Sequence, residues 1–301
     1  MPFRITDSAT NARLTTQITT SRQRLVAAQD QLSSGKRINR VSDDPNGANA
    51  VIRLRTKQAE LDQFSQNVAS TKEALQVGDT ALNSYQQLLD RARVLLTNAG
   101  TAAFYDKARV PVATELDGII ERIRQVANTQ VGETYTFGGT RVNTPPYDVN
   151  GVPATTPTTE VTIQVDPQGT LITTGVTAES FLADSTGTVI DALKTASAAI
   201  RGTGNEAADK ATIFATNDRL KGFADLADQA RTKVGERLNH ADSISERISQ
   251  YHLSLEESAQ RIETVDVAQA AIALKESDTA LNAILQAAGQ FGRRTLLDFL
   301  G

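Results

Sequence analysis

With 31 Lys and Arg against 35 Asp and Glu, the 301-residue chain carries a formal net charge of −4, so it lacks the overall basic field that attracts nucleic acid. The absence of cysteine excludes a disulfide framework and any thiolate site, and two histidines leave little for a metal. Aromatic residues make up only 5% of the chain and tryptophan is absent, which favours long helices packed side by side over a compact enzyme core.

The first arm of the chain predicts a helix with a narrow apolar stripe. Apolar and small residues recur at spacings of three and four, as in a coiled-coil seam, at Leu14, Ile18, Ser21, Leu25, Ala28 and Leu32. A stripe this narrow buries too little surface to offset the entropy of ordering an isolated helix. We therefore expect its large residues to become ordered in a subunit interface, at Leu14, Ile18, Leu25 and Leu32.

A hinge between two helices is predicted next. Gly35 falls where the first stripe ends, and a residue without Cβ can adopt the left-handed conformation that closes a helix. Ser42, Asp43 or Asp44 can then cap the following helix, and Pro45 fits its first turn because no donor is lost there. A generic helical hairpin would carry the same local features, so these residues alone do not name a function.

The second arm has the most regular pattern in the sequence. Apolar residues fall at every seventh position, at Leu54, Leu61, Val68, Leu75, Leu82, Leu89 and Leu96. A strict seven-residue period predicts one helix of about 48 residues, roughly 70 Å long, that supercoils with a partner. Gly100 is expected to end it, and a third helix is expected after Asp106.

Strand and turn signals replace the helical pattern in the middle of the chain. Residues 131–140 alternate threonine with Tyr135 and Phe137, which predicts a short strand and turn whose rings fill a core. Residues 161–172 carry a hairpin pattern, and a helix is expected over 187–201. We interpret 141–205 as a small inserted domain of strands and a helix, exposed to solvent, with no residue that identifies a ligand.

The return arm restores the helical pattern to the C-terminus. Its last stripe includes Leu281 and Ile284 and continues through Phe291, Leu297 and Phe299. This stripe is as narrow as the first one, so we expect the two ends of the chain to cover each other and to leave surface for further copies. The predicted divisions are 1–45, 46–140, 141–205, 206–270 and 271–301. The predicted fold is mainly α, a long antiparallel helical rod made by both arms, with a small inserted β-containing domain.

Candidate chemistry is sparse. Asp43 and Asp44 form the best carboxylate pair, but helix capping accounts for both. His240 and His252 are twelve residues apart, which does not match the i, i+4 pair of a helical zinc site. We therefore expect no enzymatic activity, no cofactor and no metal. The polar start of the chain predicts no cleaved signal peptide, and no apolar run is long enough for membrane insertion.

The hinge at residues 32–45 resembles the N-terminal signature shared by bacterial flagellins and the flagellar hook-associated proteins. The resemblance rests on Ser33-Ser34-Gly35-Lys36-Arg37-Ile38 and on Asp43-Asp44-Pro45. The hairpin pattern at 132–140 and the tail at 296–300 are more similar to the hook-associated proteins at the junction between hook and filament. The resemblance covers the terminal arms and one internal landmark, and the middle of the chain matches nothing that we can name.

The resemblance implies a structural protein that assembles into a ring through its terminal helices, between a neighbouring hook-associated protein and flagellin. It also implies export through the type III channel to the cell exterior, and a cytoplasmic export chaperone that masks the C-terminal stripe. A flagellin that builds the filament itself is the nearest alternative. A cytoplasmic coiled-coil adaptor or enzyme is the alternative of another class, and it predicts ionisable residues that meet in a pocket.

Overall fold

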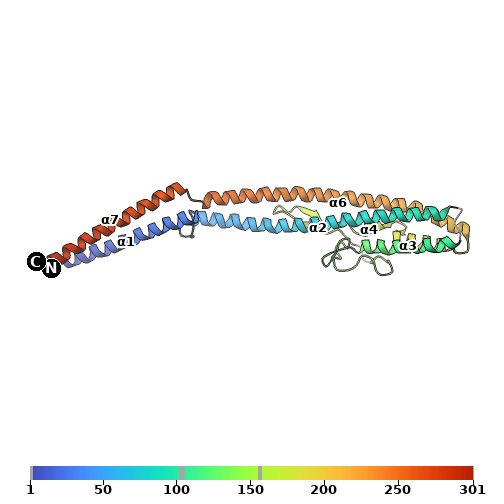
Figure 1. Cartoon of the computed structure of the whole chain (residues 1–301), viewed down its shortest axis with the longest axis horizontal. Coiled ribbons are helices and arrows are strands. Elements are labelled where there is room, and N and C mark those ends of the chain that lie inside the picture. Colours follow the sequence, from blue (N-terminus) through green and yellow to red (C-terminus); the bar gives the residue numbers. More distant parts are fainter. Residues whose placement is uncertain (1–2, 102–105, 155–157, 301) are drawn as a thin grey trace. The chain divides into compact units, whose positions relative to one another are not determined.

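The computed structural model describes residues 3–101, 106–154 and 158–300, without the side chains of residues 3–8, 10, 106–108 and 290–300. Long helices dominate it, and its strands are two or three residues long. The predicted mainly α fold class with a small β-containing region is confirmed (Figure 1). The chain folds into two compact units, one formed by residues 1–59 and 251–301 and the other by residues 60–250.

The first unit pairs the two ends of the chain. Helix α1 (Phe3–Ser34) and helix α7 (Val267–Leu300) run antiparallel and side by side, with Cα atoms of the two helices within 8 Å of each other. This unit also contains the start of α2 (Pro45–Gly100) and the end of α6 (Glu206–Glu263). Two short breaks separate α1 from α2 and α6 from α7.

The second unit is built on the seven-residue repeat of α2. All members of that row from Leu61 to Leu96 are buried, and α3 (Asp106–Ala127) and α6 add their own apolar faces. Helix α2 is 56 residues long, somewhat longer than predicted, because the Asp44 cap starts it well before the first leucine of the row. Gly100 ends α2 without a left-handed conformation; a Cβ there would lie 2.8 Å from the Phe214 ring.

Three two-stranded antiparallel sheets lie along these helices. Strands β1 (Gln130–Val131) and β2 (Thr134–Tyr135) pair Gln130 with Tyr135. Strands β3 (Thr162–Gln164) and β4 (Leu171–Thr173) form the predicted hairpin, with Ile163 opposite Ile172. Helix α4 (Glu179–Leu182), strands β5 (Ala183–Asp184) and β6 (Gly187–Thr188), and helix α5 (Val189–Arg201) complete the unit.

Much of the segment 141–205 packs into the core of the long helices. Most of its buried apolar residues, from Tyr147 to Ile200, belong to the same apolar cluster as those of α2, α3 and α6, while Val165 and Ile172 of the β3–β4 hairpin are buried outside that cluster. Phe181 stacks edge-on against Tyr85 and Phe137, with ring centroids 5.4 and 5.0 Å away. The compact units therefore divide the chain differently from the five predicted segments, because α4 and α5 bury their apolar faces against the long helices.

Arginines of α6 attach the hairpins to this helical frame. Arg219 makes a two-pronged ion pair with Asp184 of β5, at 2.7 and 2.8 Å. Arg237 reaches Glu160 at 2.6 Å, and Arg247 reaches Asp166 at the turn of the β3–β4 hairpin at 3.1 Å. The Arg219 guanidinium holds the pKa of the Asp184 carboxyl well below its usual value.

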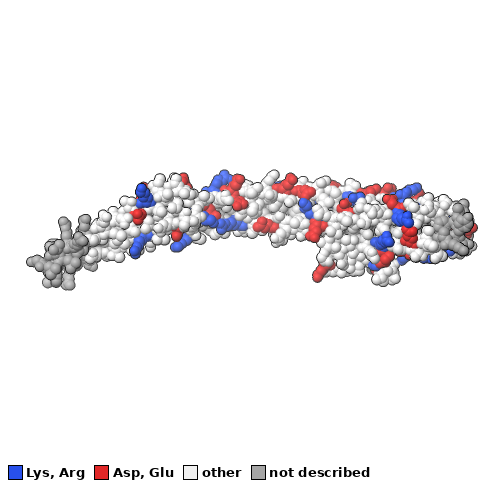
Figure 2. All heavy atoms as spheres, viewed as in Figure 1, with Lys and Arg blue, Asp and Glu red and all other residues white. Residues whose placement is uncertain are grey.

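The visible face of the molecule mixes both signs of charge, without a broad field of one sign (Figure 2). Across the described ranges, no helix combines the length and the hydropathy that a membrane span requires. Within the same ranges, no group of three or more His, Cys, Asp or Glu side chains gathers where it could hold a metal ion.

Candidate assembly site

The candidate site lies in the first unit, where the two breaks meet and the terminal helices begin. Helix α1 ends at Ser34, and Gly35 follows in the left-handed conformation with φ 69°, as predicted. The Ser34 hydroxyl accepts a hydrogen bond from the Lys36 amide at 3.2 Å and donates to the Asp30 carbonyl at 2.6 Å. These bonds satisfy polar groups that the end of the helix leaves free.

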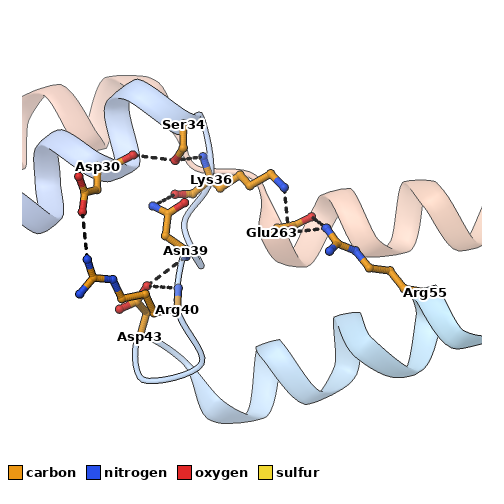
Figure 3. Close-up of polar contacts among 8 residues, drawn as sticks. All are labelled: Asp30, Ser34, Lys36, Asn39, Arg40, Asp43, Arg55 and Glu263. Carbon is orange, nitrogen blue, oxygen red and sulfur yellow. Dashed lines mark hydrogen bonds and ion pairs between the residues drawn. The ribbon is translucent and has the colours of Figure 1, made fainter.

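The two aspartates of the first break have different roles. Asp43 accepts hydrogen bonds from the Asn39 and Arg40 amides, at 3.0 and 2.8 Å, so it closes a turn of the loop (Figure 3). Asp44 is the residue that caps α2, because its Oδ1 accepts the Gly47 amide at 2.9 Å and Pro45 takes the first helical position. The prediction that Asp43 could cap the helix is corrected, since its carboxylate is already used inside the loop.

Close packing surrounds the Asp44 cap. The Gly47 amide, with help from the Arg37 guanidinium, holds the pKa of the Asp44 carboxyl below its usual value. A Cβ on Gly47 would lie 2.5 Å from Asp44 Oδ2 and 2.6 Å from Ile38 Cδ1. Ile38 is itself buried, so the helix start depends on a glycine at this position.

Replacing Gly47 by alanine is expected to loosen the start of α2, because the added methyl displaces either the capping carboxylate or Ile38. We expect a local cost of about 1–2 kcal/mol, which lowers hydrogen-exchange protection of the first α2 amides roughly tenfold. Gly222→Ala is the matched control, since a Cβ there meets open space inside helix α6 and should stabilise it slightly. Equal protection in Gly47→Ala and the unaltered chain would refute the role given to this glycine.

The first break pairs with the second one, which joins α6 to α7. The Arg37 amide donates to the Glu263 carbonyl at 2.7 Å, and the Val265 amide donates to the Gly35 carbonyl at 3.1 Å. Lys36 and Thr264 thus form a short antiparallel bridge between segments more than 200 residues apart. We call residues 35–44 together with 262–266 the paired break.

Side chains reinforce the paired break. The Glu263 carboxylate accepts from Lys36 Nζ at 3.1 Å and from Arg55 Nη2 at 2.8 and 3.0 Å (Figure 3). Arg37 Nη2 donates to the Ile262 carbonyl at 2.9 Å. Since these cations are roughly half exposed, each ion pair is worth little alone, and the backbone bridge together with the caps fixes the geometry.

The break before α7 was missed from the sequence, where 206–270 was predicted as one helical stretch. It contains neither glycine nor proline, the residues that marked the first break. Asp266 caps α7, with its Oδ1 accepting the Ala268 and Gln269 amides at 2.9 and 3.2 Å. An Asp followed three residues later by a Gln is a known signal for a helix start, and it could have located this break.

Burial varies among the residues of the two terminal stripes. Ala28 and Leu281 are buried, while the others with described side chains are only partly covered, at Leu14, Ile18, Leu25, Leu32 and Ile284. Phe291, Leu297 and Phe299 lie outside the described side chains. Helices α1 and α7 lie side by side, and the role of these residues toward other subunits stays a prediction.

Apolar side chains remain uncovered on the outside of this helix pair. Val26 of α1 is 50% exposed, and on α7 Ile272 and Leu285 are 60% and 48% exposed. The helix pair buries only a few apolar side chains and leaves other large ones in water. It therefore has surface for further apolar contacts. Such surface could be covered by a further chain.

Comparison with known proteins shows what the N-terminal part of the chain is similar to. The model for the bacterial flagellin N-terminal helical region matches residues 5–141. We call these residues the flagellin-type region, after what they are similar to. The match confirms the resemblance to flagellins and hook-associated proteins that residues 32–45 indicated.

Relatives of this flagellin-type region include both kinds of flagellar protein. The chain is 35% identical over 105 residues to a flagellin of Listeria monocytogenes, covering 35% of this chain and 37% of that protein. It is 27% identical over 132 residues to flagellar hook-associated protein 3 of Salmonella typhimurium, covering 44% and 42%. The chain thus spans less than half the length of these curated relatives in each match.

The fold is also shared with a solved structure from Vibrio parahaemolyticus, provisionally assigned as a flagellar hook-associated protein. The two superpose with a TM-score of 0.68 at 21% identity, over 74% of this chain and 100% of that one. At this identity the likeness concerns the fold alone. It extends well beyond the flagellin-type region and therefore into the return arm.

Proposed function

We propose that this chain is a structural subunit of the bacterial flagellum that assembles through its paired terminal helices at the junction between hook and filament. The observation that carries the proposal is a flagellin-type region whose α1 lies against α7 while apolar side chains of both helices stay exposed. Such a pair gains buried apolar area when further copies pack around it, which favours polymerisation. The similarity to flagellar hook-associated protein 3, together with a fold shared over 74% of this chain with a protein provisionally assigned to the same class, supports the junction in particular.

The second candidate is a flagellin that forms the filament itself. The 35% identity to a flagellin favours it, and the flagellin-type region is common to both candidates. Against it stand the sequence of the 132–140 hairpin and of the C-terminal tail, which resemble the junction proteins more. The location of the chain in the flagellum separates the two candidates.

Immunogold electron microscopy on flagella from cells that produce a tagged full-length chain tests the proposal. A single labelled zone between hook and filament is the expected result, and cells without the chain should keep their hooks while they release unpolymerised filament subunits. Label along the whole filament would support the flagellin alternative. Flagella without any label would contradict both candidates.

The proposal extends to partners and to the route out of the cell. A ring of copies would contact a neighbouring hook-associated protein on one side and flagellin on the other. The amphipathic α7, with exposed Ile272 and Leu285, is a suitable ligand for the apolar groove of a cytoplasmic export chaperone. We further propose export through the type III channel, which places the assembled chain outside the cell.

A further inference from the structure

Helix α1 carries an open groove that its own partner helix leaves unfilled. The groove encloses about 800 Å³ between α1 and residues 39–43 of the paired break, and no described residue of α7 lines it. Val26 lies in this groove and is 50% exposed, about 160° around the helix from the buried Ala28. The α1 wall of the groove is a row of residues one turn apart, namely Ile18, Arg22, Val26 and Asp30. The groove is therefore open to another chain.

Arg22 brings an unpaired positive charge to this groove. The two acids that line the groove have partners, because Asp30 Oδ2 lies 4.0 Å from Arg40 Nη2 and Asp43 accepts backbone amides of the loop (Figure 3). Arg22, in contrast, forms no ion pair with any residue that the structure describes. The residues three and four positions away from it on α1 are all uncharged, so nothing along its own helix offsets the charge. The groove thus offers an apolar side chain and an unpaired cation one turn apart.

Helix α7 carries the complementary pair of side chains on an exposed face. Ile272 is 60% exposed and lies nine residues before the buried Leu281, which places the two on opposite sides of the helix. Glu276, one turn beyond Ile272, is exposed and forms no ion pair with the described part of the chain. The residues three and four positions away from it on α7 are also uncharged. One turn further in each direction the row continues with Ala268 and Ala280, whose small side chains let another helix approach closely.

The order of these side chains sets the direction of the contact. Along α1 the cation precedes the apolar residue, whereas along α7 the apolar residue precedes the acid. We propose, on the basis of the proposed self-assembly, that the Ile272–Glu276 face of one copy docks antiparallel into the α1 groove of a second copy. Val26 then meets Ile272, and Arg22 meets Glu276. A parallel approach would instead bring Arg22 to Ile272 and leave both charges unpaired.

Copies that all point the same way can make this contact. Because α1 and α7 run antiparallel within one copy (Figure 1), α7 of one copy and α1 of a neighbour with the same orientation are antiparallel as well. In the same register Ala268 lies opposite Asp30 and Ala280 lies opposite Ile18, so small side chains face the two ends of the groove wall. Because the groove and the Ile272–Glu276 face are different surfaces, the contact is head-to-tail, the kind that builds rings and helical stacks.

Charge reversal in the full-length chain tests this contact. Arg22→Glu and Glu276→Arg should each lower incorporation into flagella about tenfold, because each brings two like charges together between copies. The double variant restores opposite charges and should incorporate like the unaltered chain. Since the two residues form no ion pair within one described chain, this rescue reports a contact between copies. Arg24→Glu is the matched control, an exposed arginine of α1 outside the groove, and it should incorporate normally. A double variant as defective as the single ones would contradict the contact.

Cysteine cross-linking provides a second measurement, because the natural chain has no cysteine. Cells would produce full-length Val26→Cys and Ile272→Cys chains together, so that a link between the two positions joins different copies. After mild oxidation of their flagella, we expect a disulfide-linked dimer that contains one chain of each kind. Val26→Cys with Leu285→Cys is the matched control and should give no such dimer, since Leu285 is exposed on another face of α7. Dimers of a single variant would overturn the proposal, because they require the same surface of two copies to meet.

The two measurements also separate this contact from the proposed function on which it rests. If the unaltered chain enters flagella but neither the charge rescue nor the mixed dimer is seen, the docking proposal fails while the proposed function stands. If the unaltered chain never enters flagella, both fail.

Discussion

An aspartate in place of Ala28 is expected to abolish assembly of this protein into flagella. Ala28 is buried on the apolar stripe of α1, and α1 lies against α7. A carboxylate at this position must either remain without a partner or force the helices apart. We expect a loss of roughly 3 kcal/mol per subunit contact, or about a hundredfold in association, measured as incorporation into flagella and as swimming motility.

The matched control for that experiment is the neighbouring residue. Ala27 is exposed on the same helix, so Ala27→Asp adds the same charge and the same change of helix propensity without burying it. It should assemble much better than Ala28→Asp. Thermal unfolding of the second unit, which does not contain residue 28, should be the same in both variants. Normal assembly of Ala28→Asp would refute the role of the α1–α7 pair.

Features that depend on local chemistry could be predicted from the sequence. The seven-residue row of α2 fixed its buried face, because the period of a helix decides which side chains share a side. Gly35 was recognised because few other residues accept its positive φ. The hairpin around Asp166 and the start of α3 near Pro111 likewise rest on turn and helix-start residues whose preferences are intrinsic.

Features that depend on long-range pairing could not be predicted. Nothing near Glu263 indicates that its carboxylate meets Lys36 and Arg55, because that contact joins residues more than 200 positions apart. Interface residues on α1 were predicted from a single stripe, but which residues are buried depends on how α1 packs against α7. The small residue Ala28 is buried, while the larger Val26 remains exposed.

The middle of the chain illustrates a second limit. Prolines, threonines and turn signals at 141–205 indicated an inserted domain, and composition cannot reveal which core a short helix joins. Its residues Phe181, Leu193 and Ile200 are buried in the core of the long helices. Small segments of this size rarely bury enough surface to fold alone, which gives a physical reason for the shared core.

Phe181→Ala is expected to destabilise the whole second unit by about 3–5 kcal/mol, because it removes a fully buried ring that stacks on both Tyr85 and Phe137. The Tyr85 hydroxyl also donates to the Phe181 carbonyl at 3.2 Å, so the ring lies where α2, the segment just after β2 and α4 meet. Denaturant unfolding of the full-length chain, followed by circular dichroism, measures the effect. Phe214→Ala is the matched control, since that ring is half exposed and should cost about 1 kcal/mol or less.

The form of the transition distinguishes a shared core from an inserted domain. With one core, loss of the Phe181 ring lowers the denaturant midpoint for the helices of the second unit together with the hairpins, because they unfold cooperatively. With an independent domain at 141–205, the variant would unfold that segment early and leave the main helical transition unchanged. Two separated transitions in Phe181→Ala, with the later one at the midpoint of the unaltered chain, would therefore support the inserted domain predicted from the sequence.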